Sequence, residues 1–290
     1  MKGKVIFITV MIVAIGILLC MENNCITITN IDVGSKKLPK EFDGYCIVHL
    51  SDLHNKSFGR NQERLVNKIE KLNPDMIVIT GDIIDSRRYD EKPSVELVKN
   101  ISKIAPVYYV PGNHEMRSGK VLSLQKKLES AGARVLRNES KMIKIGTEEI
   151  LIAGIDDPYL NQKKESAVMN YEINKAVGNS KNTYKILLSH RPEKFPIYIK
   201  NNIDLTFSGH AHGGQVRLPF VGGVIAPNQG WFPKYTSGKD EKGNSTMVIS
   251  RGLGNSLAPL RIFNRPEIVV ATLKKYFAKQ NISKSLITSH

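Results

Sequence analysis

Residues of the types that bind metal ions cluster directly after short apolar runs in this chain. Five clusters occur in order: Ser51-Asp52-Leu53-His54, Gly81-Asp82-Ile83-Ile84-Asp85, Pro111-Gly112-Asn113-His114-Glu115, Ser189-His190-Arg191-Pro192 and Ser208-Gly209-His210-Ala211-His212. Histidine nitrogens and carboxylate oxygens are the usual ligands of Zn, Mn, Fe and related ions. Five of the seven histidines lie in these clusters, which favours a metal site over a set of unrelated structural histidines. Of the other two, His49 is predicted to be a core residue because it lies inside an apolar run, and His290 is at the end of the sequence.

The spacing within the clusters suits a shared site. Asp52 and His54 form a D-x-H pair, and His210 and His212 form an H-x-H pair. Because side chains alternate along an extended chain, both members of each pair point to one face. In three clusters a glycine immediately precedes a candidate ligand, at Gly81, Gly112 and Gly209. Glycine allows a sharp turn and a close approach of backbone to ions, and the amide of Asn113 adds a neutral oxygen ligand.

The apolar runs predict the strands that position these clusters. They occupy residues 45–50, 76–80, 107–110, 150–153, 186–188, 205–207, 247–249 and 268–273. Uninterrupted apolar strands are buried on both faces. Helical apolar periodicity lies between the early runs, in residues 60–72, at Val95, Val98 and Ile101, and from Val121 to Leu128 before Gly132. Alternating strands and helices predict an α/β layered domain, and the closer spacing of the later strands suggests a second sheet. In such sheets ligands bind beyond the carboxyl ends of the strands, where the five clusters lie.

The N-terminal segment predicts a membrane anchor. Lys2 and Lys4 precede 17 uncharged residues, Val5 to Met21, which is the lower limit for a spanning helix. An uncleaved anchor is favoured over a cleaved signal peptide, because the apolar run is long and no small-residue cleavage site follows, and over a buried helix. The lysines before the span predict a cytoplasmic N-terminus at residues 1–4 and an extracytoplasmic chain beyond the anchor at 5–21. We further expect a tether at 22–44, a catalytic domain at 45–275 and a basic C-terminal tail at 276–290, so that deletion of residues 1–30 would leave an active enzyme.

The composition narrows the possible partners. Lys plus Arg number 42 against 27 for Asp plus Glu, a formal net charge of +15, which suits an anionic partner or a generally solvated basic surface. The basic residues are spread along the chain, which makes nucleic acid an unlikely partner. The three cysteines, Cys20, Cys25 and Cys46, form neither a disulfide framework nor a C-x-x-C zinc motif and are predicted to be free thiols. Oligomeric state is not predicted.

Together the five clusters resemble the calcineurin-like metallophosphoesterase superfamily, whose motifs are D-x-H, G-D-x-x-D, G-N-H-E, a lone histidine and G-H-x-H. The string from His212 to Pro219, behind an N-terminal span, is similar to the membrane-anchored bacterial phosphodiesterase branch and to UDP-2,3-diacylglucosamine pyrophosphatases. The resemblance implies an αββα sandwich of four layers that holds two metal ions. No metal-ligand position departs from the family pattern.

The resemblance also implies a role for each residue. One ion would be bound by Asp52, His54 and His212, and the other by Asn113, His190 and His210, with Asp82 bridging the two. His114 would be the catalytic histidine that is not a ligand, and Asp85 and Glu115 would orient ligands. Two divalent ions, with Mn preferred and Fe, Zn or Ni possible, would lower the pKa of a bridging water. The resulting hydroxide would attack phosphorus while His114 protonates the leaving oxygen.

The function expected from these residues is hydrolysis of a phosphodiester or pyrophosphate bond, in a phosphorylated small molecule or a lipid-linked or cell-envelope substrate. An intracellular nuclease or phosphatase of the same fold is the first alternative, and a non-catalytic metal-binding scaffold is the second. One further segment is ambiguous. Residues 213–243 are rich in Gly and Pro and predict loops or short hairpins, with Phe220, Val221, Val224, Ile225, Trp231 and Phe232 either packed beneath them or exposed toward lipid.

Overall fold

Short apolar runs build two mixed β-sheets. The computed structural model describes residues 2–159, 164–178, 180, 182–255 and 260–276. The first sheet has the order β1 (Thr27–Ser35), β16 (Glu267–Lys275), β2 (Cys46–Leu50), β3 (Met76–Thr80), β4 (Val107–Val110) and β5 (Ala133–Val135). The second has the order β14 (Gly238–Lys242), β15 (Ser245–Ile249), β9 (Leu205–Ser208), β8 (Tyr184–Leu188), β7 (Glu148–Gly154) and β6 (Glu139–Ile145). Every apolar run that predicted a strand forms one.

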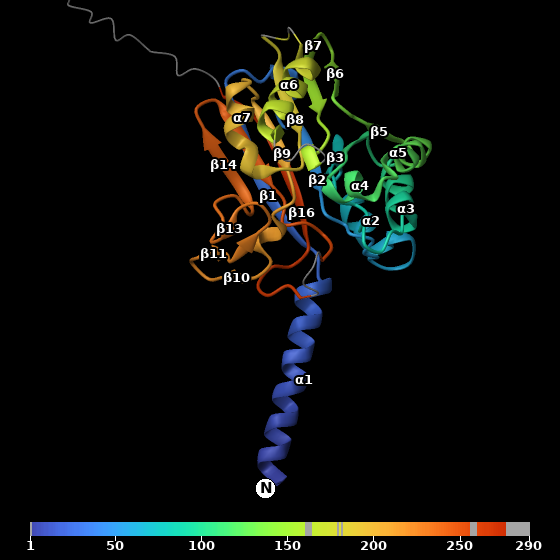
Figure 1. Cartoon of the computed structure of the whole chain (residues 1–290), viewed down its shortest axis with the longest axis vertical. Coiled ribbons are helices and arrows are strands. Elements are labelled where there is room, and N and C mark those ends of the chain that lie inside the picture. Colours follow the sequence, from blue (N-terminus) through green and yellow to red (C-terminus); the bar gives the residue numbers. More distant parts are fainter. Residues whose placement is uncertain (1, 160–163, 179, 181, 256–259, 277–290) are drawn as a thin grey trace, which may run out of the picture.

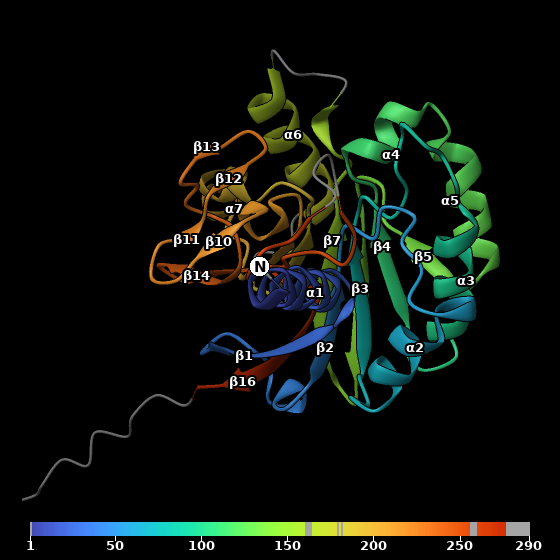
Figure 2. The same cartoon turned by 90° about the horizontal axis from the view of Figure 1, so that it is seen from below.

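Helices cover the outer face of each sheet (Figure 1 and Figure 2). On the first sheet lie η2 (Arg60–Gln62), α2 (Glu63–Glu70), α3 (Lys92–Ile101), α4 (Asn113–Ser118) and α5 (Val121–Ser130). On the second lie α6 (Glu165–Val177), η4 (Pro192–Lys194) and α7 (Phe195–Lys200). Three apolar clusters fill the spaces: one between α2, α3, α5 and the first sheet, one between the sheets, and one between the second sheet and α6 and α7. The predicted αββα sandwich is therefore confirmed.

The parallel strands bring their carboxyl ends to one rim. In the first sheet β2, β3, β4 and β5 run parallel, and in the second β7, β8, β9 and β15 do. The central strands β2, β3, β8 and β9 are almost wholly buried, as expected of parallel strands between covering layers, whereas β5 is an edge strand with Arg134 exposed. The five predicted clusters follow β2, β3, β4, β8 and β9, so strand direction alone carries them to the same edge.

The N-terminal helix α1 (Lys2–Asn24) projects away from the sandwich (Figure 1). Among the described residues it is the one helix long and apolar enough to cross a membrane, with a mean hydropathy of 2.7 over 18 residues of which 6% are buried. The predicted span at 5–21 falls within it. Exposed apolar side chains on all sides of a helix suit a lipid environment. Cys20, Cys25 and Cys46 are free, as predicted.

The tether predicted at 22–44 is wrong. Residues 27–35 form β1, which pairs in parallel with β16 from Thr27↔Glu267 to Ser35↔Lys275. Leu38 and Phe42, which follows in the short helix η1 (Lys40–Phe42), have exposed fractions of 0% and pack between the sheets. The strand escaped prediction because polar residues alternate with its buried Ile31 and Val33, as on any edge strand with one wet face. The tail predicted at 276–290 lies outside the described residues except for Tyr276, and so does His290.

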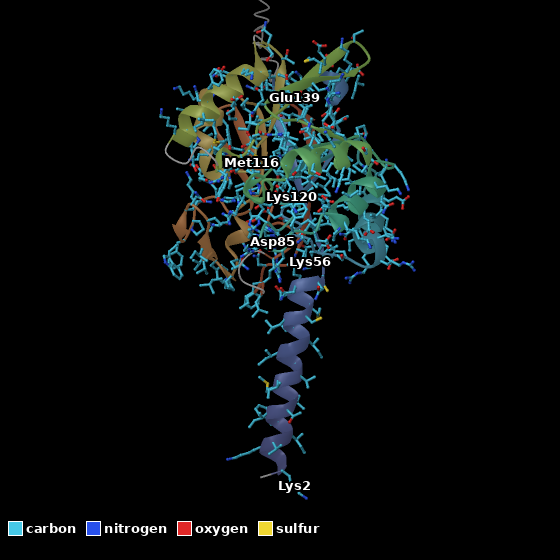
Figure 3. All side chains as sticks on the ribbon, turned by 45° about the vertical axis from the view of Figure 1, so that its right-hand side comes forward. Lys2, Lys56, Asp85, Met116, Lys120 and Glu139 are labelled. Carbon is cyan, nitrogen blue, oxygen red and sulfur yellow. The ribbon has the colours of Figure 1, made fainter. Side chains whose placement is uncertain are left out.

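The last turn of α1 is fastened to the domain. The Glu22 carboxylate, only 6% exposed, accepts hydrogen bonds from the Asn264 amide (3.0 Å) and from Arg265 Nε (2.8 Å). Asn23 Oδ1 accepts one from the Arg261 amide (3.2 Å), and its carbonyl oxygen accepts one from Lys56. Figure 3 shows Lys56 directly above the end of the helix. The helix therefore leaves the domain at a position set by several bonds.

Residues 213–237 form a loop with short hairpins, as predicted for 213–243, whereas residues 238–242 form strand β14 of the second sheet. η5 (His212–Gly214) opens it, β10 (Arg217–Leu218) pairs with β11 (Gly222–Gly223), and β12 (Ile225–Ala226) pairs with β13 (Gly230–Trp231). Of the two alternatives for its apolar side chains, exposure holds for most of them. The exposed residues of this loop are Leu218, Phe220, Val221, Ile225, Trp231 and Phe232, whereas Val224 is half-buried.

These contacts revise the position at which the anchor can be removed. A chain that lacks residues 1–20 keeps Glu22 and Asn23, and we expect it to melt cooperatively. Deletion of 1–30 also removes the first half of β1 and the Glu22 bonds, each worth about 0.5–1.5 kcal/mol, so we expect a lower melting temperature or loss of soluble protein. Thermal unfolding of both proteins, with Glu22→Ala in the full chain as a third sample, tests this. Equal melting temperatures for the two deletions would show that residues 21–30 contribute nothing to folding.

Candidate metal centre

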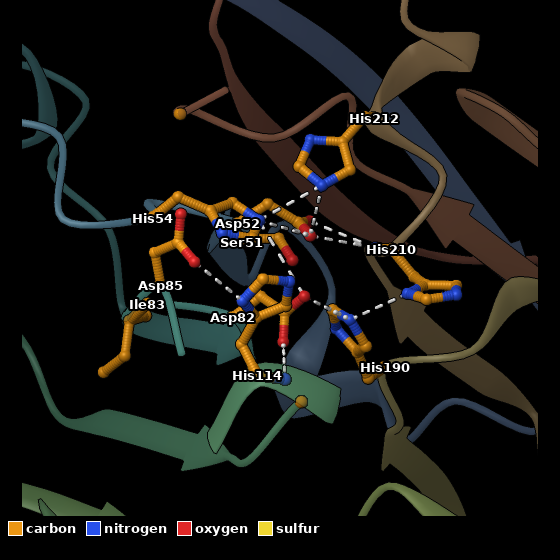
Figure 4. Close-up of polar contacts among 12 residues, drawn as sticks. Ser51, Asp52, His54, Asp82, Ile83, Asp85, His114, His190, His210 and His212 are labelled. Carbon is orange, nitrogen blue, oxygen red and sulfur yellow. Dashed lines mark hydrogen bonds and ion pairs between the residues drawn. The ribbon is translucent and has the colours of Figure 1, made fainter. Parts of the chain in front are cut away.

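The five clusters meet at one buried site (Figure 4). Asp52 and His54 follow β2, Asp82 follows β3, Asn113 and His114 begin α4 after β4, His190 follows β8, and His210 and His212 follow β9. All eight side chains are buried, with exposed fractions of at most 7%. Two sheets thus contribute to a single cluster of imidazoles, carboxylates and one amide.

One group of ligand atoms is formed by Asp52, His54 and His212. A donor atom from each lies within 4.8 Å of the others. His54 Nε2 and His212 Nε2 are 3.2 Å apart, and His212 Nε2 is 3.3 Å from Asp52 Oδ1. The Nδ1 atoms of both histidines are buried without a hydrogen-bond partner among the described residues. Imidazole nitrogens and a carboxylate oxygen that converge so closely are the donor set of a transition-metal ion.

A second group is formed by Asp82, His190 and His210. His190 Nδ1 lies 2.6 Å from the Thr80 carbonyl oxygen, to which it donates, so His190 Nε2 carries the lone pair. That nitrogen lies 3.2 Å from Asp82 Oδ2 and 3.1 Å from His210 Nδ1. His210 Nε2 in turn donates to Asn228 Oδ1 at 3.1 Å, which leaves the lone pair on Nδ1. Two nitrogen lone pairs that face each other repel, and either a proton or a metal ion between them removes that repulsion.

Asn113 completes the set of predicted ligands. Its side-chain oxygen Oδ1 is buried and accepts no hydrogen bond from the described residues. A buried amide oxygen without a partner costs about 1–3 kcal/mol, and coordination to a cation would remove that cost. The residues present therefore fit divalent metal ions.

Asp82 and His114 lie where the two groups approach each other. Asp82 Oδ2 is 3.8 Å from His54 Nε2 as well as 3.2 Å from His190 Nε2, so its carboxylate contacts a member of both groups. One nitrogen of His114 also lies within 4.8 Å of ligand atoms of His54 and Asp82. However, His114 Nδ1 accepts the Ser86 amide at 3.1 Å and lies 3.4 Å from Asp85 Oδ1. The Ser86 amide occupies the Nδ1 lone pair, which places the proton of the neutral ring on Nε2.

The backbone at the site is held in an uncommon conformation. Five of the predicted ligands have left-handed φ angles: Asp52 (52°), His54 (47°), Asp82 (52°), His210 (65°) and His212 (48°). Each such residue costs about 1–3 kcal/mol, and such residues persist where the surroundings impose them, typically at functional sites. These left-handed residues follow β2, β3 and β9, whereas Asn113 and His190, after β4 and β8, are not among them.

Close packing of the backbone explains why positions 112 and 209, which precede Asn113 and His210, are glycines. A Cβ on Gly112 would lie 2.3 Å from Asp82 Oδ1, and one on Gly209 would lie 1.9 Å from Ser51 Oγ and 2.4 Å from Asp52 Oδ2. Contacts this short do not occur, so any larger residue would displace Asp52 or Asp82. The expected close approach of backbone at these positions is confirmed.

Glu115 and Asp85 hold the metal-ligand segments and His114 in position. Glu115 is fully buried, and its carboxylate accepts the amides of Gly112 (2.7 Å), Asp82 (2.8 Å) and Ile84 (3.1 Å). It therefore ties the turn after β3 to the turn after β4. Burial, with the charge of Asp82, raises the pKa of Glu115 to about 7. Asp85 binds Arg87 Nε at 3.0 Å and faces His114, which fixes the orientation of that imidazole.

The electrostatics of the site favour positive charge. Burial opposes a charge on His190, but Asp82 and Asp52 outweigh it and raise the pKa of His190 to about 10. Burial dominates at the neighbouring rings and lowers the pKa of His210 to about 4 and of His212 to about 3. Without ions the two carboxylates thus concentrate a proton on one imidazole. A cation bound between the rings would satisfy the same field without protonating any of them.

A pocket of about 540 Å³ opens over these residues. Asp82, Asn113, His114, His210 and His212 line its floor, and Arg87, Arg117, Tyr159, Glu165, Arg191, Pro227 and Asn228 form its walls. Arg191 is held by Asp157 through Nε (2.6 Å) and Nη2 (2.9 Å), and its Nη1 lies 3.7 Å from Glu165 and 3.6 Å from Glu193. Arginines beside a floor that fits divalent cations suit an anionic ligand.

The structure also identifies supporting residues that the sequence analysis missed. Thr80 and Asn228 set the tautomers of His190 and His210, and Asn264 Nδ2 donates to the His212 carbonyl oxygen at 2.8 Å. Arg191 could have been suspected because it follows His190 directly. Asn228 and Asn264 lie in irregular loops, where no pattern marks them. His49 is a core residue as predicted, fully buried with Nε2 2.8 Å from Thr80 Oγ1.

Comparison with known proteins agrees with this geometry. A family model described as calcineurin-like phosphoesterase matches residues 46–214, which include all five clusters. The metallophosphoesterase YkuE of Bacillus subtilis (strain 168), itself uncharacterized, is 32% identical over 260 residues, 88% of this chain and 87% of that protein. Phosphodiesterase YaeI of Escherichia coli (strain K12) is 28% identical over 233 residues, 78% of this chain and 81% of that protein.

One longer relative is named as a transmembrane protein. The transmembrane protein with metallophosphoesterase domain of Danio rerio is 29% identical over 263 residues, 86% of this chain but 57% of that protein. The match of the family model across more than half of the chain, and the likeness to YkuE over most of both proteins, establish the family. This chain belongs to the calcineurin-like phosphoesterase family and is a metal-dependent hydrolase of phosphoester bonds.

Proposed function

We propose that this protein is a membrane-anchored, two-metal phosphodiesterase or pyrophosphatase that acts on a phosphorylated substrate linked to lipid or to the cell envelope. The observation that carries the proposal is the pair of buried ligand groups that approach each other at Asp82 on the floor of a pocket walled by arginines. A site of this geometry requires no serine or cysteine nucleophile.

We assign the ligands as follows. Asp52, His54 and His212 hold one ion, Asn113, His190 and His210 hold the other, and Asp82 contacts both. Two divalent ions, when bound, supply positive charge to the phosphate oxygens and lower the pKa of coordinated water. The set contains two carboxylates, so two divalent ions leave a net charge of about +2 there, which favours a phosphoester anion. Mn is our first candidate, with Fe, Zn and Ni as alternatives, because affinity order alone does not select the metal used in cells.

His114 is assigned as the general acid. The acid form of the ring is the imidazolium, in which the Nδ1 proton would face Asp85 Oδ1 at 3.4 Å in place of the Ser86 amide. Donation of the Nε2 proton to the leaving oxygen would leave a neutral ring, and a proton from solvent would restore the imidazolium. The contacts of His114 Nδ1 with Ser86 and Asp85 distinguish this residue from the other histidines at the site, whose free nitrogens converge on ligand positions.

The arginines at the wall favour a substrate with a second negative charge. Arg117 is exposed and packs over the Tyr159 ring at 4.9 Å, whereas Arg191 Nη1 already lies 3.7 Å from Glu165 and 3.6 Å from Glu193. A phosphodiester brings one charge to the ions, whereas a pyrophosphate diester brings a second charge that Arg117 would pair with. Within the proposed function, pyrophosphate bonds are therefore the preferred substrates.

The location follows from α1. Lys2 and Lys4 at its free end, with the span behind them, support an N-terminus in the cytoplasm and an extracytoplasmic catalytic domain. The alternative is an intracellular nuclease or phosphatase, and basic residues spread along the chain do not favour nucleic acid as the substrate. Cell fractionation combined with protease accessibility separates the two locations.

The direct test uses the purified full chain in detergent. Metal content is measured, and turnover is compared on nucleotide-sugar, phospholipid and bis-p-nitrophenyl phosphate substrates. We expect about two ions per chain and hydrolysis that is lost on chelation and restored by Mn. A protein that binds two ions and hydrolyses none of these classes would support the scaffold alternative instead.

Replacement of His114 tests the general acid. We expect His114→Ala to keep its metal content and to lose about 10²–10⁴-fold in kcat, since positioned acids and bases contribute that much. Metal analysis beside steady-state kinetics checks both halves of the expectation. A loss of half the metal would make His114 a ligand and overturn the assignment.

Two aspartates of the same motif form a matched pair. Asp82→Asn should lose more metal than Asp85→Asn, because Asp82 contacts both ligand groups whereas Asp85 contacts only Arg87, Arg88 and the side of His114. The metal content per folded chain, measured for both variants, tests which of the two aspartates binds metal. If the two variants retained the same metal, the shared role of Asp82 would be wrong.

The pocket arginines predict a difference between substrates. Arg117→Ala should raise KM for a pyrophosphate diester roughly 10-fold, the effect of losing one charge-assisted contact, and change kcat/KM for bis-p-nitrophenyl phosphate little. Arg88, whose side chain is 82% exposed and lies outside the pocket lining, provides the control as Arg88→Ala. Equal effects on both substrates would remove Arg117 from substrate selection.

A further inference from the structure

Nine exposed apolar side chains gather on two loops of the domain. Six belong to residues 213–243 and three to the segment before β16: Leu218, Phe220, Val221, Ile225, Trp231, Phe232, Leu260, Ile262 and Phe263. We call this set the apolar surface. Trp231 is 70% exposed, and Phe220 is fully exposed at the tip of the β10–β11 hairpin. A soluble domain rarely leaves such a set of large side chains in water unless the surface has a partner.

The two loops form one unit. The Arg217 amide donates to the Ile262 carbonyl oxygen at 3.0 Å, and Val216 and Ile262 form a parallel bridge. Asn264 joins them again, since Nδ2 donates to the carbonyl oxygens of His212 and Gln215 at 2.8 and 3.0 Å. The apolar surface is thus carried by a connected framework, and its side chains keep their positions relative to one another.

The apolar surface lies beside the point where α1 leaves the domain. In Figure 1 the hairpins β10–β13 occupy the lower edge of the domain at the level of the helix end, and Figure 2 shows them next to the helix from below. The segment that carries Ile262 and Phe263 also supplies Arg261, Asn264 and Arg265, which bind Asn23 and Glu22. The framework of the apolar surface and the attachment of the helix are therefore the same piece of chain.

We propose that the apolar surface inserts into the bilayer interface beside α1, so that the domain contacts the membrane at a second place and lies in a defined orientation on it. The occupant is a phospholipid surface, because the surface is continuous with the one helix among the described residues that is able to span a membrane. Bonds to Glu22 and Asn23 prevent the domain from swinging away on a flexible linker. Trp and Phe favour the membrane interface, and exposed Lys234 adjoins the surface where lipid phosphates would lie.

The orientation connects the membrane to the pocket. The turn between β12 and β13 contains Pro227 and Asn228, which line the pocket, and Asn228 contacts His210. The same hairpin carries Ile225 and Trp231 on its strands. Resting on the proposed function, this arrangement selects substrates whose phosphate lies just above the interface while their acyl chains remain in the bilayer. The substrate class that we infer is therefore amphiphilic phosphate esters.

The single tryptophan allows a direct test in the full chain. The protein is reconstituted into phosphatidylcholine vesicles whose acyl chains are brominated near the headgroup, and its emission is compared with that in unbrominated vesicles. We expect roughly twofold or greater quenching of Trp231, since bromine quenches an indole at the depth of the interface. Co-flotation with the vesicles first establishes that α1 anchors the chain, and failure to float would overturn the proposal together with the anchor.

A matched control moves the single tryptophan to a helix far from the apolar surface. Tyr171 is 64% exposed and belongs to α6, the helix that lies at the end of the domain far from α1 in Figure 1, so Trp231→Phe combined with Tyr171→Trp should show no quenching. Quenching equal to that of this control would overturn the insertion of Trp231. Emission that is blue-shifted in detergent without lipid, and unchanged by bromine, would indicate a second copy of the chain as the occupant and would equally overturn it.

Charged substitutions separate this inference from the proposed activity. Phe220→Asp with Phe232→Asp should abolish the quenching of Trp231, lower turnover of a vesicle-borne phosphate ester roughly 10-fold or more, and leave a soluble diester unaffected. If quenching is observed but neither substrate is hydrolysed, the proposed function fails and the membrane surface stands. If quenching is absent while both substrates are hydrolysed, the membrane surface is refuted and the proposed function stands.

Discussion

Two buried carboxylates and the lone pairs of four imidazoles occupy one rim of this molecule, and their mutual repulsion is the constraint around which the rest is arranged. His54 and His212 face each other through nitrogens 3.2 Å apart, and His190 and His210 do so at 3.1 Å. Such contacts are unfavourable when both nitrogens present lone pairs, and a proton or a metal ion between them makes the contacts favourable. In the chain without ions that need appears as the raised pKa of His190. The site is therefore built for cations even though the fold itself is built by apolar strands.

The surrounding structure opposes this repulsion with backbone geometry. Left-handed turns after the strands, together with Gly112 and Gly209, let two sheets approach closely enough for their ligands to meet. Glu115 then ties two of the turns together through three amides, an arrangement that needs a buried carboxylate. Strain at the rim is compatible with a stable protein because the layers behind it are fully apolar. The three apolar clusters supply the free energy that holds the strained turns in place.

The membrane-proximal end of the molecule is linked to the rim by a short chain of hydrogen bonds. Glu22 binds the Asn264 amide, and the Asn264 side chain binds the carbonyl oxygen of His212. Buried Arg261 lies beside them and donates to the Arg251, Gly254 and Asn264 carbonyl oxygens, which closes the loop that carries Gly252 and Gly254 against Asp52. The end of the helix and a predicted metal ligand thus belong to one packed unit. With α1 in a membrane as proposed, such an enzyme would reach substrates at a fixed height above the bilayer.

The amino-acid sequence by itself determined the layers, the strands that lead to the rim and the residue types that gather there. These features depend on local properties: apolar runs, the direction of the strands, and the glycine or histidine at a strand end. The sequence did not determine that residues 27–35 belong to the first sheet, because β1 is an edge strand whose polar face hides its period. Nor did it identify Asn228, Asn264 or the attachment of Glu22, since each depends on a contact between segments far apart in the chain. Whether Phe220 and Trp231 were buried or exposed was likewise open, because the composition of a loop does not fix what it packs against. Tertiary structure decided these points, as only the folded arrangement sets which distant groups meet and which apolar side chains remain without a neighbour.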